Sequence, residues 1–191
     1  MNKTLAAALF TATATFAGIA SAAPVTYELD STHSLQSYSY RHMGLSFASG
    51  RFDKTTGTIT LDTAAKTGSA DISIDVGSLN TGVAKLDEHL KSKDFFEADK
   101  YPTITFKSSS FKFSGDKLSS VTGDLTVHGV TKPVTLTVTS FACIDHPMKK
   151  VPACAANAEA TIKRSEFGVG NYVPMVSDEV KLSLEVEALK K

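Results

Sequence analysis

The side chains best suited to metal binding or proton transfer in this sequence are histidines, and their spacing argues against a metal site. The sequence contains five of them: His33, His42, His89, His128 and His146. No two stand four residues apart or share a short loop, as the ligands of common metal sites do. We therefore predict neither a bound metal nor another cofactor.

Two of these histidines are candidates for acid–base chemistry. His33 stands near Asp30 and Ser34, and His42 follows a tyrosine-rich segment, so folding could bring either one next to a carboxylate. However, the sequence has no Gly-x-Ser-x-Gly elbow, no Gly-rich phosphate loop and no His-Glu-x-x-His helix. The stronger prediction is a protein without catalytic residues, and an enzyme that uses His42 or His33 stays an alternative.

The two cysteines, Cys143 and Cys154, are separated by a segment that contains Pro147 and Pro152. Because prolines disfavour regular structure, this segment is predicted to be a loop or the end of a hairpin. A disulfide in an exported protein would clamp it and contribute roughly 3 kcal/mol. The alternatives are two unrelated buried thiols and a metal pair, which is weaker because His146 leaves the usual four ligands one short.

The first residues have the composition of a secretory signal. Lys3 supplies a positive charge, residues 5–19 are almost free of large polar groups, and Ala20-Ser21-Ala22 fits the cleavage rule for small residues. A membrane-spanning helix needs about 20 predominantly apolar residues, more than this segment offers. We predict a signal peptide over residues 1–22, a mature domain over residues 23–191, and a periplasmic location.

The charges of the chain balance, with 20 Lys and Arg against 20 Asp and Glu. Such a balance offers no electrostatic attraction to nucleic acid or to an anionic membrane. We therefore predict no nucleic-acid partner. Homodimerisation through exposed apolar positions is compatible with the sequence, but no apolar stripe indicates it.

Strand signals dominate the mature chain. Apolar residues alternate with Ser, Thr or charged residues in five clear segments, at 58–62, 71–76, 102–106, 134–139 and 180–187. A period of two places one face of each strand toward an apolar interior and the other toward water. Short Gly-bearing connections between the segments favour antiparallel hairpins. The prediction is an all-β protein.

Counting such segments gives roughly eight strands, which suits a closed, lipocalin-like barrel. A barrel of this size either fills with side chains or holds one slender ligand. A two-sheet sandwich satisfies the same alternation and stays an alternative.

One short segment has helical periodicity instead. Val83, Leu86 and Leu90 recur at helical spacing over residues 83–90, and Thr81 is a candidate N-cap. A second turn is expected at residues 94–96. We predict that this insertion forms a lid beside the barrel through its large apolar residues, which are Leu86, Leu90, Phe95 and Phe96.

Several strings resemble the YceI family of periplasmic polyisoprenoid-binding proteins, in family order and over essentially the whole mature chain. They are Asp30-Ser31-Thr32-His33-Ser34, Arg41-His42-Met43-Gly44-Leu45, Gly50-Arg51-Phe52, residues 87–96 leading to Tyr101-Pro102, residues 122–134, and Arg164-Ser165-Glu166-Phe167-Gly168. The resemblance implies a lipocalin-like barrel whose apolar channel holds a long isoprenoid, such as a prenyl quinone or polyprenyl phosphate, or a comparable lipid. It implies no catalytic residue, and it suggests roles in stress response and lipid handling.

The chain departs from the family pattern before the Arg-His-Met-Gly string. Family members usually place Val, Phe and Val where this sequence has Gln36, Tyr38 and Tyr40. If these side chains face inward, each needs a hydrogen-bond partner. Two interpretations stay open: the ligand carries a polar group deep inside, or these groups bond to one another or to water near the barrel mouth.

The leading hypothesis is a periplasmic carrier that encloses a long apolar lipid in the barrel, because each methylene removed from water contributes about 0.8 kcal/mol. Besides this carrier and the enzyme that uses His42 or His33, a third hypothesis is an interaction module whose core is filled with side chains and holds no ligand. The residues predicted to line the channel are Gln36, Tyr38, Tyr40, His42, Phe52, Ile59, Ile74, Ile104, Phe106, Leu125, Val127, Leu136, Leu182 and Leu184.

Overall fold

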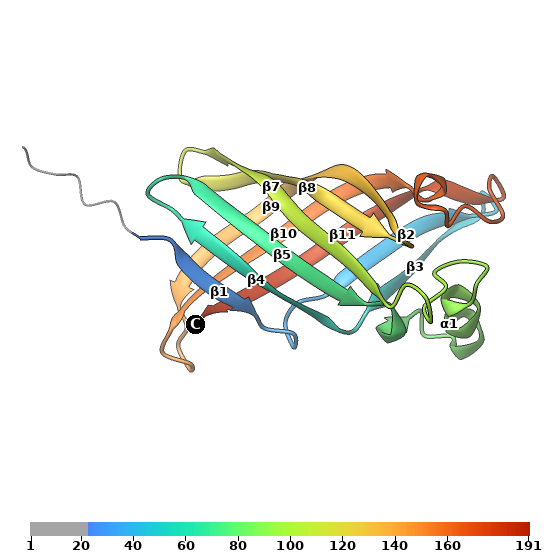
Figure 1. Ribbon diagram of the computed structural model, residues 1–191, viewed down its shortest axis with the longest axis horizontal. Coiled ribbons are helices and arrows are strands. Elements are labelled where there is room, and N and C mark those ends of the chain that lie inside the picture. The colour runs from blue at the N-terminus through green and yellow to red at the C-terminus, as the bar shows by residue number, and fades with distance from the viewer. Residues whose placement is uncertain (1–22) are drawn as a thin grey trace, which may run out of the picture.

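The computed structural model describes residues 23–191 and shows one antiparallel sheet with a helical insertion (Figure 1). The predicted signal peptide lies outside these residues. The strands are β1 (Val25–Leu29), β2 (Gln36–His42), β3 (Ser46–Phe52), β4 (Thr55–Asp62), β5 (Thr67–Asp75), β6 (Leu79–Asn80), β7 (Thr103–Ser114), β8 (Lys117–Val127), β9 (Val130–Asp145), β10 (Pro152–Lys163) and β11 (Val176–Lys190). The helices are α1 (Ala84–Lys91) and two short 3-10 turns, η1 (Val76–Ser78) and η2 (Arg164–Phe167).

Eight strands close into a barrel, which confirms the predicted fold class. Hydrogen-bonded neighbours follow the order β1-β4-β5-β7-β8-β9-β10-β11, and β11 pairs back onto β1. Every neighbouring pair is antiparallel. Because this ring leaves none of its strands with a free edge, a two-sheet sandwich is ruled out.

At three of the eight strand positions around the barrel, two successive strands take the place of one long strand. β11 pairs with β2 through its first half and with β1 through its last residues, so β1 and β2 together occupy one position. β3 and β4 together occupy the next position, and β5 and β6 occupy the one after it. At the end of the barrel formed by β2, β3 and β6, the insertion that carries α1 connects β6 to β7 (Figure 1).

Local turn chemistry fixes the register of the hairpins. The β8–β9 connection consists of His128 and Gly129 alone, with φ values of 51° and 74°. A two-residue turn with positive φ at both positions is the type I′ geometry that matches strand twist. This turn brings Val127 opposite Val130 and leaves the long β8–β9 ladder in regular register.

The helix begins one residue later than its apolar spacing predicts, and two details of the prediction were wrong. Val83 precedes α1 and is 56% exposed, so it does not join the apolar face. Thr81 does not cap the helix; its hydroxyl donates instead to Asp87 Oδ1 at 2.6 Å. Because Asp87 also accepts the Thr81 backbone N–H at 2.7 Å, the helix is tied to the residues before it through its first turn.

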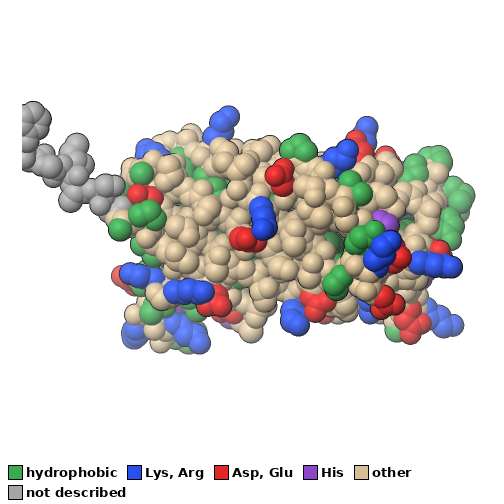
Figure 2. Space-filling view, viewed as in Figure 1, with side chains coloured by type: hydrophobic (Ala, Val, Ile, Leu, Met, Phe, Trp, Pro, Cys, Tyr) green, Lys and Arg blue, Asp and Glu red, His purple; other side chains and the backbone are tan. Residues whose placement is uncertain are grey.

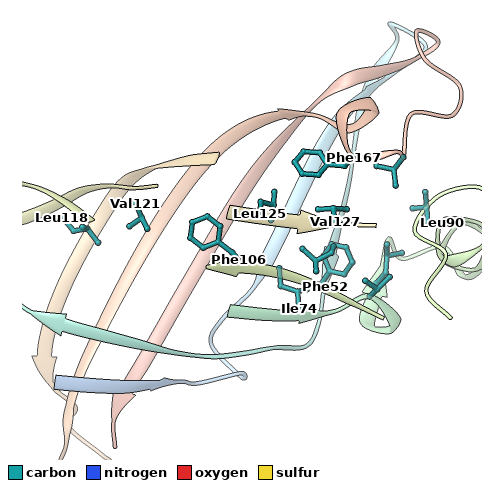
Figure 3. Close-up of a cluster of buried hydrophobic side chains, with 13 residues drawn as sticks. Phe52, Ile74, Leu90, Phe106, Leu118, Val121, Leu125, Val127 and Phe167 are labelled. Atoms are coloured by element: carbon teal, nitrogen blue, oxygen red, sulfur yellow. The ribbon is translucent and has the colours of Figure 1, made fainter. Parts of the chain in front are cut away.

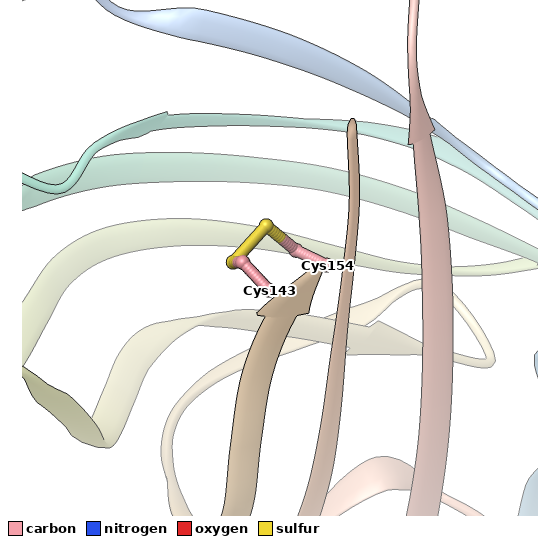
Figure 4. Close-up of a disulfide and its surroundings, with 2 residues drawn as sticks. All are labelled: Cys143 and Cys154. Atoms are coloured by element: carbon pink, nitrogen blue, oxygen red, sulfur yellow. A yellow bond between two sulfur atoms is a disulfide. The ribbon is translucent and has the colours of Figure 1, made fainter. Parts of the chain in front are cut away.

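The disulfide between Cys143 and Cys154 is present and joins opposite residues of β9 and β10 (Figure 4). Their Cα atoms are 4.1 Å apart, and the two residues face each other directly across the hairpin. The bridge closes the hairpin beside residues 146–151, as the prolines between the cysteines predict.

Apolar side chains from β3, β5, β7 and β8 gather with Leu90 of α1 inside the barrel (Figure 3), and a second cluster adds residues of β1, β4, β10 and β11. The larger cluster combines Phe52, Phe106 and Leu125 from the wall with Leu90 from α1 and Phe167 from η2. Within residues 23–191, no helix is long and apolar enough to cross a membrane. The apolar side chains of the core line the inner wall of the barrel.

Candidate functional site

The barrel encloses a cavity of about 490 Å³ whose wall is overwhelmingly apolar. Side chains from strands all around the barrel, from the α1 insertion and from η2 contribute to this wall. Pockets that bind small molecules have volumes of about 300–1,000 Å³ and are lined mainly by apolar side chains. The size and the composition of the cavity therefore suit one slender apolar molecule.

The structure places every side chain predicted for the channel on this cavity wall, on the inward face of its strand. The fourteen are Gln36, Tyr38, Tyr40, His42, Phe52, Ile59, Ile74, Ile104, Phe106, Leu125, Val127, Leu136, Leu182 and Leu184. The four residues predicted for the lid, Leu86, Leu90, Phe95 and Phe96, also line the cavity. Phe96 packs edge-on against Phe52 with ring centroids 5.9 Å apart, which joins the insertion to the barrel.

Other lining residues were not predicted, although most continue the same alternation. Leu61, Phe111 and Val121 occupy inward positions on β4, β7 and β8 toward the end of the barrel away from α1. The period of two could have identified them. Arg164 also lines the cavity, and no sequence pattern predicts this because arginine is almost never fully buried without a partner.

Arg164 is 8% exposed, and its guanidinium donates to four backbone carbonyls. Nη1 donates to Val169 and Asn171 at 2.6 and 2.8 Å, Nε donates to Ser177 at 2.8 Å, and Nη2 donates to Val176 at 2.8 Å. Desolvation lowers the pKa of this guanidinium, but the shift leaves an arginine protonated at neutral pH. Arg164 thus holds residues 169–177 in place beside the cavity.

The polar side chains of β2 point into the cavity, and each has a different environment. Gln36 Nε2 donates to the Glu185 carbonyl at 3.2 Å, so its amide is paired within the protein. The Tyr38 hydroxyl is buried and has no hydrogen-bond partner among residues 23–191. Burial raises the pKa of this hydroxyl, which therefore stays protonated. The Tyr38 ring packs against Gly50, and a Cβ at this position would clash with the Tyr38 hydroxyl oxygen.

The cavity opens at one end of the barrel. Among its lining residues, only His42, Met43, Tyr172 and Met175 are exposed. They belong to two adjacent segments, the β2–β3 hairpin tip and the loop before β11, and the Met43 N–H donates to the Met175 carbonyl at 2.8 Å. These two segments therefore form the mouth of the cavity.

The two histidines considered for catalysis do not form a shared site. His42 lies at the mouth, at the end of β2, whereas His33 lies in the turn before β2 and is not on the cavity wall. A seven-residue strand separates them by on the order of 20 Å. The described part of the chain also contains no group of three or more His, Cys, Asp or Glu residues that could hold a metal ion.

His33 and Asp30 instead lock the turn between β1 and β2. Asp30 accepts hydrogen bonds from the Thr32 hydroxyl at 2.6 Å, the Thr32 N–H at 2.9 Å and His33 Nδ1 at 3.0 Å. The bonds from the Thr32 and His33 side chains lower the pKa of Asp30 from 3.8 to about 2. Its bond with Asp30 raises the pKa of His33, so both groups favour their charged forms.

We expect this turn to make the protein sensitive to acid. Because the pKa of Asp30 is lower in the folded chain, its contribution is present above about pH 4 and is lost as the pH falls toward about 2. Asp30→Asn should remove about 1 kcal/mol from the free energy of unfolding at neutral pH, allowing for solvent screening. Urea denaturation at several pH values measures this.

The matched control is Asp116→Asn, because the Asp116 side chain is fully exposed and, within residues 23–191, pairs only with Lys66 at 3.4 Å. This change should leave the pH dependence of stability as it is in the unmodified chain. Equal acid sensitivity in the Asp30→Asn variant and the unmodified chain would show that the turn contributes nothing.

Comparison with known proteins agrees with this architecture. The model of the YceI-like domain matches residues 27–188. A UPF0312 protein of Pseudomonas aeruginosa and the protein YceI of Shigella flexneri are each 36% identical to the chain over 194 residues, covering 100% of both sequences.

Solved structures show the same fold. Burkholderia cenocepacia BcnA superposes with a TM-score of 0.69 at 30% identity, over 83% of this chain and 98% of BcnA. A polyisoprenoid binding domain from Saccharophagus degradans, described as implicated in plant cell wall breakdown, gives a TM-score of 0.67 at 18% identity, over 87% and 99% of the two chains. At that identity the likeness shows the fold alone. The match over residues 27–188 and the full-length relatives place the chain in the family of YceI-like domains.

Proposed function

We propose that this protein is a periplasmic carrier that holds one long apolar lipid, an isoprenoid such as a prenyl quinone or a molecule of similar shape, inside its barrel. The observation that carries the proposal is the cavity of about 490 Å³ with an apolar wall and a single exposed mouth. The polyisoprenoid binding domain from Saccharophagus degradans has the same fold, so this fold is compatible with binding a ligand of this class. The cross-strand disulfide supports an oxidising compartment.

The hydrophobic effect alone is enough to retain such a ligand. Each methylene transferred from water to the cavity contributes about 0.8 kcal/mol, so a chain of several isoprene units binds tightly without a charged anchor. No acid–base pair is needed for this role, and the separated positions of His33 and His42 favour binding over catalysis.

The phenols of β2 favour a ligand that carries oxygen at one end. Tyr38 and Tyr40 stand on the same wall with ring centroids 6.3 Å apart, between the middle of the barrel and His42 at the mouth. A buried hydroxyl without a partner costs about 1–3 kcal/mol, and a ligand oxygen within reach would remove that cost. A prenyl quinone fits this pattern, with its ring toward the mouth and its tail toward the disulfide end.

The proposal is tested by extracting the protein, purified from its own host, with organic solvent and identifying the extract by mass spectrometry. We expect close to one long-chain lipid per protein and saturable binding of a prenyl quinone to the delipidated chain. An extract without stoichiometric lipid, together with no binding of prenyl quinones, would overturn the proposal.

A further inference from the structure

The mouth of the cavity is surrounded by exposed apolar side chains, which we call the apolar rim. Its members and their exposed fractions are Met43 (57%), Leu45 (83%), Phe47 (76%), Tyr172 (51%), Val173 (39%) and Met175 (60%). They lie together because the β2–β3 hairpin pairs with the start of β11. Figure 2 shows hydrophobic side chains gathered at this end of the molecule. Contiguous exposed apolar surface on a soluble domain marks an interaction site.

The rim carries almost no charge. Residues 43–50 and 169–177 contain no Asp, Glu, Lys or Arg. Arg41 flanks the rim, with its guanidinium 5.6 Å from the centre of the Phe47 ring, and the buried guanidinium of Arg164 binds carbonyls of residues 169, 171 and 176 behind it. Asp94 of the lid lies beside the rim, because its backbone carbonyl accepts a hydrogen bond from the Asn171 side chain. The carboxylate oxygen Oδ2 of Asp94 is 3.8 Å from Nε2 of His89. A rim of this composition suits hydrocarbon better than a charged protein surface.

The rim is also continuous with the interior of the barrel. Met43, Tyr172 and Met175 are exposed, and the same side chains line the cavity. A protein partner or a second copy seated on the rim would close the mouth. A bilayer seated there would extend the apolar interior of the cavity into the hydrocarbon of the membrane, so a lipid could pass without crossing water.

We infer that the apolar rim is a membrane-docking surface, which inserts shallowly into one leaflet of a lipid bilayer and lets the ligand move between membrane and cavity. This inference rests on the proposed carrier function. Transfer through water would expose every methylene of the ligand at about 0.8 kcal/mol each, a barrier that docking removes. Because the chain carries no net charge, docking depends on apolar contact and needs no anionic lipid.

The test is flotation of the purified protein with phosphatidylcholine vesicles. The variant Leu45→Ser with Phe47→Ser removes two rim side chains that do not line the cavity. We expect it to partition onto vesicles at least about tenfold more weakly than the unmodified chain, since each buried side chain of this size contributes a factor of about ten or more. When delipidated and then loaded with a prenyl quinone in detergent, the variant should hold as much ligand as the unmodified chain, because its cavity wall is unchanged.

A matched control comes from the opposite end of the barrel, at the β9–β10 hairpin (Figure 1). Ile144 and Met148 are 60% and 82% exposed there and do not line the cavity. Ile144→Ser with Met148→Ser removes a comparable amount of exposed apolar surface, and we expect vesicle binding to be unchanged.

A second readout uses the absence of tryptophan from the sequence. Phe47→Trp places a single fluorophore on the rim, and Met148→Trp places one on the far hairpin. Vesicles should shift the emission of the first to shorter wavelength and leave the second unchanged.

The outcomes separate the docking inference from the carrier proposal. Bound lipid without vesicle binding, or vesicle binding that survives Leu45→Ser with Phe47→Ser, overturns the docking inference alone. A dimer in solution that this variant dissociates, with no vesicle binding by the unmodified chain, also overturns it, because a second copy then covers the rim. Rim-dependent vesicle binding by a protein that holds and takes up no lipid overturns the carrier proposal instead.

Discussion

Replacing Ala158 with phenylalanine is expected to abolish most lipid binding without unfolding the barrel. Ala158 lies on β10 between Val138 of β9 and Leu184 of β11, is 9% exposed, and lines the cavity. A phenyl ring at this position occupies space that the ligand needs. If it displaces one five-carbon isoprene unit, binding loses about 4 kcal/mol, or several-hundredfold in affinity.

Stability should not fall in parallel with binding. The new ring enters an existing cavity, so it fills space that would otherwise be empty when the ligand is absent. We expect the free energy of unfolding of the delipidated variant to stay within about 1 kcal/mol of that of the unmodified chain.

The control for Ala158→Phe is Thr161→Phe on the same strand, because Thr161 is exposed on the outer face. This variant should bind a prenyl quinone as the unmodified chain does. Titration of both variants with the quinone and extraction of bound lipid measure the difference. Unchanged binding by Ala158→Phe would mean that the ligand lies outside the cavity.

Replacing Arg164 with methionine is expected to cause the largest loss of stability. The change removes four hydrogen bonds to the carbonyls of residues 169, 171, 176 and 177, while keeping a side chain of similar length. Carbonyls that lose a charged donor and stay partly buried cost about 1–3 kcal/mol each, and water can reach some of them in this loop. We expect a loss of about 3 kcal/mol in urea denaturation, with faster hydrogen exchange over residues 169–177.

One further variant separates the geometry of the Arg164 hydrogen bonds from the charge of the side chain, and another is a control at the neighbouring position. Arg164→Lys keeps the positive charge but has a single nitrogen, which cannot reach four carbonyls in fixed directions, so most of the loss should persist. Lys163→Met alters the preceding exposed residue and should change stability little. An Arg164→Met variant as stable as the unmodified chain, with an equally protected loop, would contradict this account of the mouth.

The barrel could be predicted from the sequence because its strands are long and alternate strictly. On β11, Leu182, Leu184 and Val186 face inward, while Lys181, Ser183 and Glu185 face water, so a period of two identifies the lining directly. On β2 the alternation alone left the inward face open, and the structure places Gln36, Tyr38 and Tyr40 on the cavity wall.

The features that the sequence did not predict depend on contacts between distant segments. The break between β1 and β2 is held by Ser34, whose hydroxyl donates to the Glu187 carbonyl and accepts from its N–H, both at 3.1 Å. Arg164 satisfies carbonyls that exist as a cluster only after the loop before β11 has folded around it. The mouth was missed for the same reason, since Met43 and Met175 become neighbours only through the β2–β11 pairing.

The most direct test of the central claim, that a lipid occupies the interior of the barrel, is a crystal structure of the protein purified from its own host without delipidation. Continuous tubular density is expected along the cavity, from the lining of Leu118 and Val121 past Tyr38 to the mouth at Met43. A lumen closed by side chains from end to end, or an open cavity containing only separate water molecules, would contradict it.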